Sequence, residues 1–303
     1  MASYLEARSS RGEWLVRIED LDPVREIPGA SKEILNTLIA LGMKWDGDVF
    51  YQSQRHEAYE AAFAVLEKRR LLYLCTCSRK EIADSSITGM DGPVYPGACR
   101  NRSVLPGYSG AWRVRTDDHL IELTDVLQGR IQQRLEIDIG DFVLRRADGI
   151  FTYQLAAVVD DAAQGVTHIV RGADLLNSTP RQIYLQRLLG YSTPVYMHLP
   201  VAVNEMGEKL SKQTCAAVVD TSDPLPQLIT AIRFLGQMPP EELIEGDIAS
   251  FWKWAFQNWK SEMIPRKKHE FAGMAYGETR GRDRNYSEVS PSSQLATPYC
   301  RKT

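Results

Sequence analysis

The chain has 303 residues and a mass of 34.2 kDa, which is enough for one large α/β domain or two smaller ones with a sizeable core. Apolar residues make up 44% of it and charged residues 25%, and this composition excludes collagen-like, wholly disordered and disulfide-scaffold proteins. The net charge of −3 excludes a globally basic nucleic-acid binder but is compatible with a local basic patch.

Three features of the sequence predict a cytoplasmic protein with no membrane partner. No apolar run approaches the roughly 18 residues that a membrane span requires. The first residues lack a charged region followed by an apolar stretch, so we predict no signal peptide. The five cysteines are odd in number and unevenly spaced, which favours a reducing compartment over a secreted disulfide framework.

The first 72 residues predict helices and short strands in alternation, with Ser31 as the cap of a helix that ends at Gly42. The expected elements are, in order, the end of a helix at 4–8, a buried strand at 14–18, a helix at 31–41, a strand at 49–51 and a helix at 56–72.

The second half repeats this alternation. The expected elements are a hairpin at 142–154 with an Asp-Gly turn, a helix at 155–164, a strand at 167–171, a helix opened by Ser178, Thr179 and Pro180 as capping residues alone, and a strand-like stretch at 195–204. Strands that alternate with helices predict an α/β protein with a doubly wound parallel sheet.

Changes in composition divide the chain into five expected parts. They are the first part of the α/β domain (1–72), a loop-rich insertion (73–110), the second part of the domain (111–213), a helical C-terminal part (214–265) and a disordered tail (266–303) in which basic residues outnumber acidic ones.

The insertion holds a candidate zinc site. Cys75, Cys77 and Cys99 lie close together in a chain without a secretory signal, and three thiolates suit tetrahedral Zn²⁺. The fourth ligand stays open between Tyr95 and His119. The alternative is that three unrelated cysteines are buried in an irregular segment.

A second candidate site brings together groups near predicted strand ends. Glu19, Tyr153 and Arg171 each lie near the end of an expected strand, and ligands of open α/β sheets gather there. An arginine offers a bidentate fork for a carboxylate, and a glutamate offers a counter-charge for an ammonium group. The three together predict an α-amino-acid site, whereas each alone could be structural, Arg171 by pairing with Asp174.

A third candidate is the loop Lys209-Leu-Ser-Lys-Gln213, whose two lysines could reach one polyphosphate, with Ser211 orienting the loop. The alternative is a solvated surface turn. For the other polar residues we predict structural roles: His198 as a satisfied core histidine, and Asp160 and Asp161 as a solvated acidic turn.

Four segments in order resemble the catalytic domain of the class I glutamyl/glutaminyl-tRNA synthetases, over about residues 1–265. They are Val16-Arg-Ile-Glu-Asp-Leu-Asp22, residues 165–176, Ser178-Thr-Pro-Arg-Gln-Ile-Tyr184 and residues 209–213. Residues 75–77, 94–100, 140–149 and 153–156 resemble a short branch of the family, which attaches glutamate to the queuosine of tRNA(Asp).

The resemblance implies a Rossmann-like domain with a zinc-containing insertion, acting as a cytoplasmic monomer. It implies that glutamate reacts with ATP and Mg²⁺ to form glutamyl-adenylate. The implied roles are catalysis for Lys209 and Lys212, ATP binding for Ser211 and Lys212, glutamate binding for Glu19, Tyr153 and Arg171, and zinc binding for Cys75, Cys77, Tyr95 and Cys99.

The sequence departs from the family pattern at its start. The family opens with a strand, a Pro-Ser-Pro-Thr-Gly-like turn and a HIGH-type helix start, which binds phosphate through free N–H groups. This motif is not in the sequence, and Met1 aligns with the end of that helix. The comparison implies an N-terminally truncated form that activates glutamate poorly. The alternatives are a fragment of a tRNA-charging glutamyl-tRNA synthetase and an inactive paralogue that binds tRNA or zinc.

Overall fold

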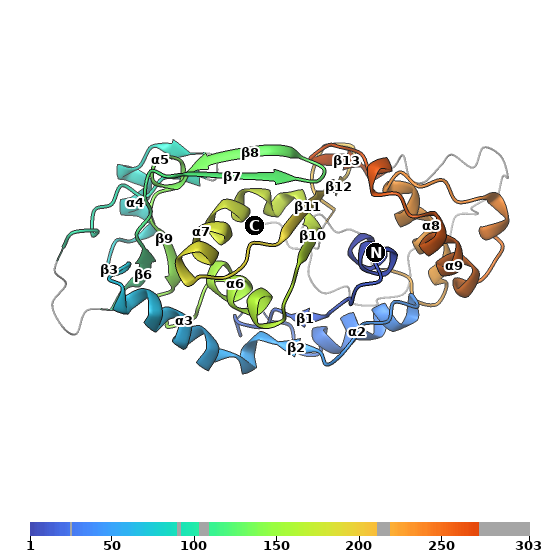
Figure 1. Ribbon diagram of the computed structural model, residues 1–303, viewed down its shortest axis with the longest axis horizontal. Coiled ribbons are helices and arrows are strands. Elements are labelled where there is room, and N and C mark those ends of the chain that lie inside the picture. The colour runs from blue at the N-terminus through green and yellow to red at the C-terminus, as the bar shows by residue number, and fades with distance from the viewer. Residues whose placement is uncertain (25, 90–91, 103–108, 211–218, 273–303) are drawn as a thin grey trace, which may run out of the picture.

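The computed structural model describes residues 1–24, 26–89, 92–102, 109–210 and 219–272 (Figure 1). The longer helices are α1 (Ala2–Ser9), α2 (Ala30–Ala40), α3 (His56–Lys68), α4 (Arg79–Ser85), α6 (Tyr153–Ala163), α7 (Thr179–Leu189), α8 (Pro224–Phe234) and α9 (Ile248–Asn258), with one turn at α5 (Leu135–Asp138). The strands are β1 (Arg17–Ile18), β2 (Phe50–Tyr51), β3 (Leu72–Cys75), β4 (Thr88–Gly89), β5 (Gly92–Pro93), β6 (Ala111–Val114), β7 (Leu120–Asp125), β8 (Gly129–Arg134), β9 (Phe142–Arg145), β10 (His168–Gly172), β11 (Val195–Leu199), β12 (Val201–Val203) and β13 (His269–Phe271).

The parallel strands predicted from the sequence are present, but in the described residues they form separate pairs rather than one doubly wound sheet. β1 pairs with β2, β10 with β11, and β12 with β13, each in parallel. A cavity lined by residues of both β1 and β10 lies between the first two pairs. A side-chain contact links the elements on the two sides of this cavity: the Arg17 guanidinium of β1 contacts Asp161 near the end of α6.

The main core lies between helices α3, α6 and α7 and the antiparallel sheet β3-β6-β9. Leu66, Val114, Leu144, Leu155 and Leu185 are completely buried in it. Each such side chain contributes about 2 kcal/mol of transfer free energy, so this core can hold functional side chains on rigid elements. The hairpin β7-β8 packs on the outer side of α7 (Figure 1).

The predicted hairpin at 142–154 is partly wrong. Gly149 has a φ of +88° in the turn, and a single bridge joins Arg145 to Phe151, but no second strand follows. The Thr152 amide donates to the Leu144 carbonyl at 2.8 Å, and α6 begins at the next residue. Tyr153 therefore opens a helix instead of ending a strand.

Two predicted helix starts also differ from the structure. Ser31 lies inside α2, which follows Gly29 at a φ of +87°, so glycine and not serine occupies the cap. At α7 neither Ser178 nor Thr179 makes a side-chain capping bond, although Pro180 does lie in the first turn. Thr179 is instead a partner of Arg171, as described below.

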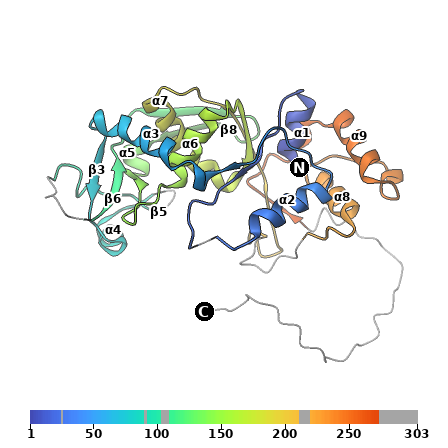
Figure 2. The same cartoon turned by 90° about the horizontal axis from the view of Figure 1, so that it is seen from below.

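A second apolar cluster joins the two ends of the described chain. Tyr4 and Leu5 of α1 pack with Phe251 and Trp252 of α9, beside α2 and α8 (Figure 2). The Trp259 indole donates to the Glu6 carboxylate at 2.7 Å, and the Trp252 indole donates to the Leu41 carbonyl at 2.8 Å.

The segment expected to be a disordered tail begins with ordered residues, because β13 pairs with β12 and the Val201 amide donates to the Lys268 carbonyl. Residues 273–303 of that segment lie outside the described part of the chain. None of the described helices combines the length and the apolar content that crossing a bilayer would demand.

Candidate active site and metal centre

Glu19, Tyr153 and Arg171 line one cavity of about 560 Å³. Glu19 follows β1, Tyr153 opens α6, and Arg171 lies in β10. The three residues predicted from strand ends, which span positions 19 to 171, are thus brought to one place. Residues of α1 and of the segment that follows it also line the cavity.

Arg171 is held by three side chains from three different elements. Its Nη1 donates to the Tyr153 hydroxyl at 3.0 Å, its Nη2 to Thr179 Oγ1 at 2.9 Å, and its Nε to His198 Nε2 at 3.1 Å. A guanidinium has five N–H groups, of which these contacts use three. The second Nη2 N–H faces the Leu175 carbonyl at 3.5 Å, so among the described contacts one N–H on Nη1 is not used. The prediction that Thr179 serves capping alone is therefore wrong.

His198 is completely buried, as predicted for a core histidine, and its Nδ1 lies 2.6 Å from Asp125 Oδ2. Burial acts to raise the pKa of Asp125, but hydrogen bonds from His198 and from the Gln128, His198 and Leu127 amides outweigh it and leave this pKa below its usual range. Asp125 is therefore ionised, and it faces the ring nitrogen that lies away from Arg171.

The prediction of a solvated acidic turn at Asp160 and Asp161 is wrong, because both side chains are buried. Asp160 accepts hydrogen bonds from Gln52, Arg55 and Tyr59. These partners lie more than 100 residues earlier in the chain, so no local pattern could reveal them.

Asp161 and Glu19 share one arginine. Arg17 Nη1 lies 2.6 Å from Asp161 Oδ1, and its Nη2 lies 3.2 Å from Glu19 Oε1. Burial raises the pKa of Asp161 even though Arg17 opposes the shift. Through its contacts with both carboxylates, Arg17 orients the Glu19 side chain at the cavity. This role of Arg17 was not predicted from the sequence.

A neighbouring cavity of about 850 Å³ meets the first one at Arg17, Glu19 and Tyr153. Arg79 and Arg146 are among the residues that line it. The two cavities together offer room for a substrate larger than one amino acid.

The predicted phosphate loop is described only at its start. The Lys209 Nζ lies 2.6 Å from Asp174 Oδ2, just beyond β10, and Lys209 forms a bridge to Val203 of β12. The structure therefore places the start of the loop beside the end of the Arg171 strand. Ser211 and Lys212 lie outside the described residues.

The cysteine cluster has the geometry of a metal centre. The Sγ atoms of Cys75, Cys77 and Cys99 all lie within 4.8 Å of one another. The Tyr95 hydroxyl lies 3.3 Å from Cys75 Sγ and 3.9 Å from Cys77 Sγ. Zn–S bonds of about 2.3 Å in a tetrahedron put ligand atoms about 3.8 Å apart, so these four residues fit zinc.

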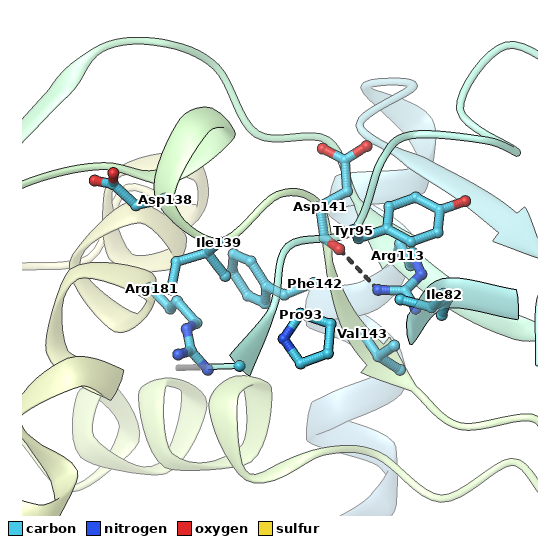
Figure 3. A pocket seen from close by; sticks show the side chains of 11 residues that line it. Ile82, Pro93, Tyr95, Arg113, Asp138, Ile139, Asp141, Phe142, Val143 and Arg181 are labelled. Atoms are coloured by element: carbon cyan, nitrogen blue, oxygen red, sulfur yellow. Dashed lines mark hydrogen bonds between the residues drawn. The ribbon is translucent and has the colours of Figure 1, made fainter. Parts of the chain in front are cut away.

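Of the two candidates for the fourth ligand, the geometry selects Tyr95. His119 is 80% exposed and pairs with Asp117, whereas Tyr95 is buried against the sulfurs. The Arg113 guanidinium lies 3.9 Å from the centre of the Tyr95 ring and donates to the Asp141 carbonyl at 2.8 Å (Figure 3). Arg113 thus holds the ring at a cavity of about 190 Å³ that both residues help to line. The Tyr95 hydroxyl contacts the cysteine sulfurs.

The thiols differ in their surroundings. Burial acts to raise the pKa of Cys99, but hydrogen bonds from the Thr76 backbone, Cys77 and Tyr95 lower it to about 7. Burial and the neighbouring Cys99 raise the pKa of Cys77 to about 11. A bound divalent cation would remove this difference in pKa between the two thiols, because a metal binds thiolates and displaces their protons.

Comparisons with known proteins identify the family of the chain. Residues 1–245 match the catalytic domain of the class I tRNA synthetases (E and Q). The chain belongs to this family and is a ligase of the class I aminoacyl-tRNA synthetase type, as its motifs predict.

Individual relatives show which members of the family the chain resembles. The chain is 54% identical over 269 residues to the glutamyl-Q tRNA(Asp) synthetase of Dechloromonas aromatica, covering 88% of this chain and 89% of that protein. It is also 54% identical, over 265 residues, to the glutamyl-Q tRNA(Asp) synthetase of Chromobacterium violaceum, with 88% of each chain covered.

Among solved structures, a glutamate tRNA ligase from Elizabethkingia meningosepticum in complex with its amino acid has the same fold, with a TM-score of 0.71 and 21% identity. The match covers 90% of this chain and 63% of the ligase, so the chain spans less than two thirds of that protein.

Proposed function

We propose that the protein activates L-glutamate with ATP to form glutamyl-adenylate and transfers the glutamyl group to the queuosine of tRNA(Asp), in the cytoplasm and as a monomer. The observation that carries the proposal is the meeting of Glu19, Tyr153 and Arg171 on one cavity. The relatives named glutamyl-Q tRNA(Asp) synthetase, at 54% identity over most of the chain, support the choice of acceptor.

The cavity can recognise both charges of an amino acid. The Glu19 carboxylate offers an acceptor for the ammonium group. Because Arg171 already uses Nε and Nη2 on protein partners, a substrate carboxylate would meet its remaining Nη1 N–H. The Tyr153 hydroxyl accepts from the same Nη1 and so can donate its own proton to that carboxylate. The donor pair is thus one arginine nitrogen and one phenol, in place of the bidentate fork expected from the sequence.

In the activation step, a carboxylate oxygen of glutamate attacks the α-phosphorus of ATP and pyrophosphate leaves with its bond electrons. Charge grows on the leaving oxygens, and we assign its stabilisation to Lys212 and Ser211, with Mg²⁺ as counter-ion of the nucleotide. Lys209 is anchored by Asp174 at the strand end and holds the start of this loop near the cavity.

Zinc would be held by Cys75, Cys77, Cys99 and Tyr95. Four protein ligands leave no open position, so the metal would supply structural support for the insertion and no chemistry.

The decisive experiment has two arms. Calorimetric titration with glutamate, glutamine and aspartate reads the amino-acid site without depending on the ATP site, and we expect glutamate to bind best. Glu19→Gln and Tyr153→Phe should each weaken it, whereas His119→Gln, at an exposed position far from the cavity, serves as the matched control. Transfer of labelled glutamate is then compared on tRNA(Asp) with queuosine, tRNA(Asp) without it, and tRNA(Glu). Labelling of tRNA(Glu) alone would contradict the proposed acceptor.

A further inference from the structure

The structure contains a buried acid–histidine pair whose members do not line the cavity but whose histidine contacts Arg171 of the lining. Asp125 and His198 are both completely buried at the side chain, and their closest atoms lie 2.6 Å apart. Burying an ionised carboxylate costs several kcal/mol unless it is fully hydrogen-bonded. A pair of this kind is a poor source of stability, so its position calls for another explanation.

Strand register places His198 directly beside Arg171. In the parallel pair β10-β11, Arg171 and His198 are register partners, so their side chains leave the same face of the two strands. The His198 Nε2 then meets the Arg171 Nε at 3.1 Å. A slip of one residue would turn the imidazole to the opposite face.

The contacts determine which ring nitrogen of His198 carries the proton. Arginine has no acceptor, so Nε2 can meet the Arg171 Nε–H only as an unprotonated acceptor. The Thr179 hydroxyl lies 3.2 Å from the same Nε2 and fits this assignment, because a hydroxyl that accepts from Arg171 can still donate its own proton. The proton must then lie on Nδ1, where it points to Asp125 Oδ2. Asp125 is itself immobilised, because its Oδ1 accepts from the amides of Leu127, Gln128 and His198.

We propose that Asp125 and His198 are positioning residues, which hold the Arg171 guanidinium in the orientation that presents Nη1 and the Tyr153 hydroxyl to the substrate carboxylate. Asp125 selects the tautomer of His198, and His198 Nε2 accepts the hydrogen bond from the Arg171 Nε–H. With Nε and Nη2 both engaged, the guanidinium plane cannot rotate about its own axis. This inference rests on the proposed function, since it assigns the group that the carboxylate of glutamate would contact.

Two substitutions of one residue separate positioning from packing. The amide of His198→Gln reaches the place of Nε2 and can still accept from Arg171, whereas the amide of His198→Asn reaches only the place of Nδ1 and can still donate to Asp125. Each substitution therefore keeps one of the two side-chain hydrogen bonds of His198 and removes the other. We expect His198→Gln to bind glutamate within about threefold of the unmodified protein and His198→Asn to bind roughly tenfold more weakly, as the loss of one hydrogen bond to a charged group predicts.

Asp125→Asn tests the tautomer. The asparagine oxygen would keep the three backbone amides, so its NH₂ would face His198 Nδ1 and move the ring proton to Nε2, against the Arg171 N–H. We expect about tenfold weaker glutamate binding in calorimetry, and ¹⁵N NMR of labelled histidine should show Nδ1–H in the unmodified protein and Nε2–H in this variant. Gln237→Leu is the control: Gln237 is also buried and bonded to backbone, but it does not line the cavity and its amide donates to Ile232 of the second apolar cluster, so the substitution should lower the melting temperature without changing glutamate affinity.

Equal weakening by His198→Asn and His198→Gln, glutamate binding unchanged in Asp125→Asn, or an Nε2–H tautomer in the unmodified protein would each overturn the inference. If the unmodified protein binds no glutamate, the proposed function fails, and the tautomer measured by NMR then decides on the pair separately.

Discussion

The cysteine cluster and the amino-acid cavity hold their functional side chains in opposite ways. The cluster takes Cys75, Cys77, Tyr95 and Cys99 from one short stretch, and these residues with Tyr73 are nearly all of its apolar core. The cavity takes its residues from β1, α6, β10 and, behind them, α7 and β11. Of these elements, α6 and α7 belong to the main core, Tyr196 of β11 is buried in it, and Ile169 of β10 packs against it. Where little apolar surface is buried, we expect bonds to a metal to supply the order; where much is buried, hydrogen bonds can set an orientation.

This difference predicts that the two sites fail independently. The largest expected effect is on the metal: the double variant Cys75→Ser, Cys99→Ser should fall from about one zinc per chain to none by metal analysis. Glutamate affinity should stay within about threefold, because the described cavity lining includes none of the cluster's residues. Full zinc retention in the double variant would contradict the assignment of the metal ligands. Loss of glutamate binding together with the zinc would show that the two sites are not independent.

The next largest effect concerns the phosphate loop. In this test and the next, the form assayed is extended at its start by the family's phosphate-binding motif. In that form, Lys212→Ala should lower kcat of glutamate-dependent pyrophosphate exchange by roughly 10²–10³-fold, because its charge is needed as pyrophosphate leaves. The KM for glutamate should change little. Steady-state exchange with glutamate and ATP varied separately provides the measurement, and wild-type kinetics would take the adenylation role away from this loop.

A smaller effect of a different kind is expected at the strand end. Arg171→Ala should raise the KM for glutamate by roughly 10–100-fold with less change in kcat, because a contact made throughout the reaction is lost. Arg171→Lys should not rescue it, since one ammonium group cannot reach Tyr153, Thr179 and His198 together. Zinc content should be unchanged in both variants. An equal fall of kcat and kcat/KM would show instead that Arg171 contacts the substrate only in the transition state.

The smallest effect sharpens the comparison within the insertion. Ser78 accepts from the Glu81 amide and caps α4, so Ser78→Ala should cost about 1 kcal/mol, or roughly fivefold in zinc affinity. Ser85→Ala is the matched control, because the Ser85 hydroxyl only donates to a carbonyl of its own helix. Competition with a zinc-binding dye would measure both, and equal affinities would show that the metal site does not depend on α4.

The cysteine cluster could be predicted from the sequence because its signal is local. Three cysteines in one segment are visible in the residues themselves, whereas only the coordinates show that Tyr95, and not His119, lies beside them. The metal itself stays a prediction. Element types were predicted equally well wherever apolar spacing was clear, as in α3, α6 and α7. The hairpin at 142–154 was mispredicted because the backbone contact of Thr152 with Leu144 lets a helix begin at Tyr153.

The amino-acid site was only half visible. Glu19 and Arg171 follow from strand ends, but Arg17, Thr179 and the pair Asp125–His198 depend on contacts between distant segments, and Asp125 and His198 are 73 positions apart. One signal was present: Arg171 and His198 are each the fourth residue of a five-residue strand, in adjacent parallel strands. Without the strand boundaries that register could not be read.

The apolar cluster that joins α1 to α9 has a consequence for how the chain folds. Glu6 and Trp259 are 253 positions apart, and Leu41 and Trp252 are 211 apart, so α1 and α2 are synthesised long before the helices that cover them. Contacts across such separations form slowly, because loop entropy is lost before they are gained. We therefore expect the main core to form first, leaving the apolar faces of α1 and α2 exposed to chaperones and proteases until α9 arrives. A ribosome that stalls before Trp252 would leave a protein whose first two helices lack the apolar partners that α9 supplies.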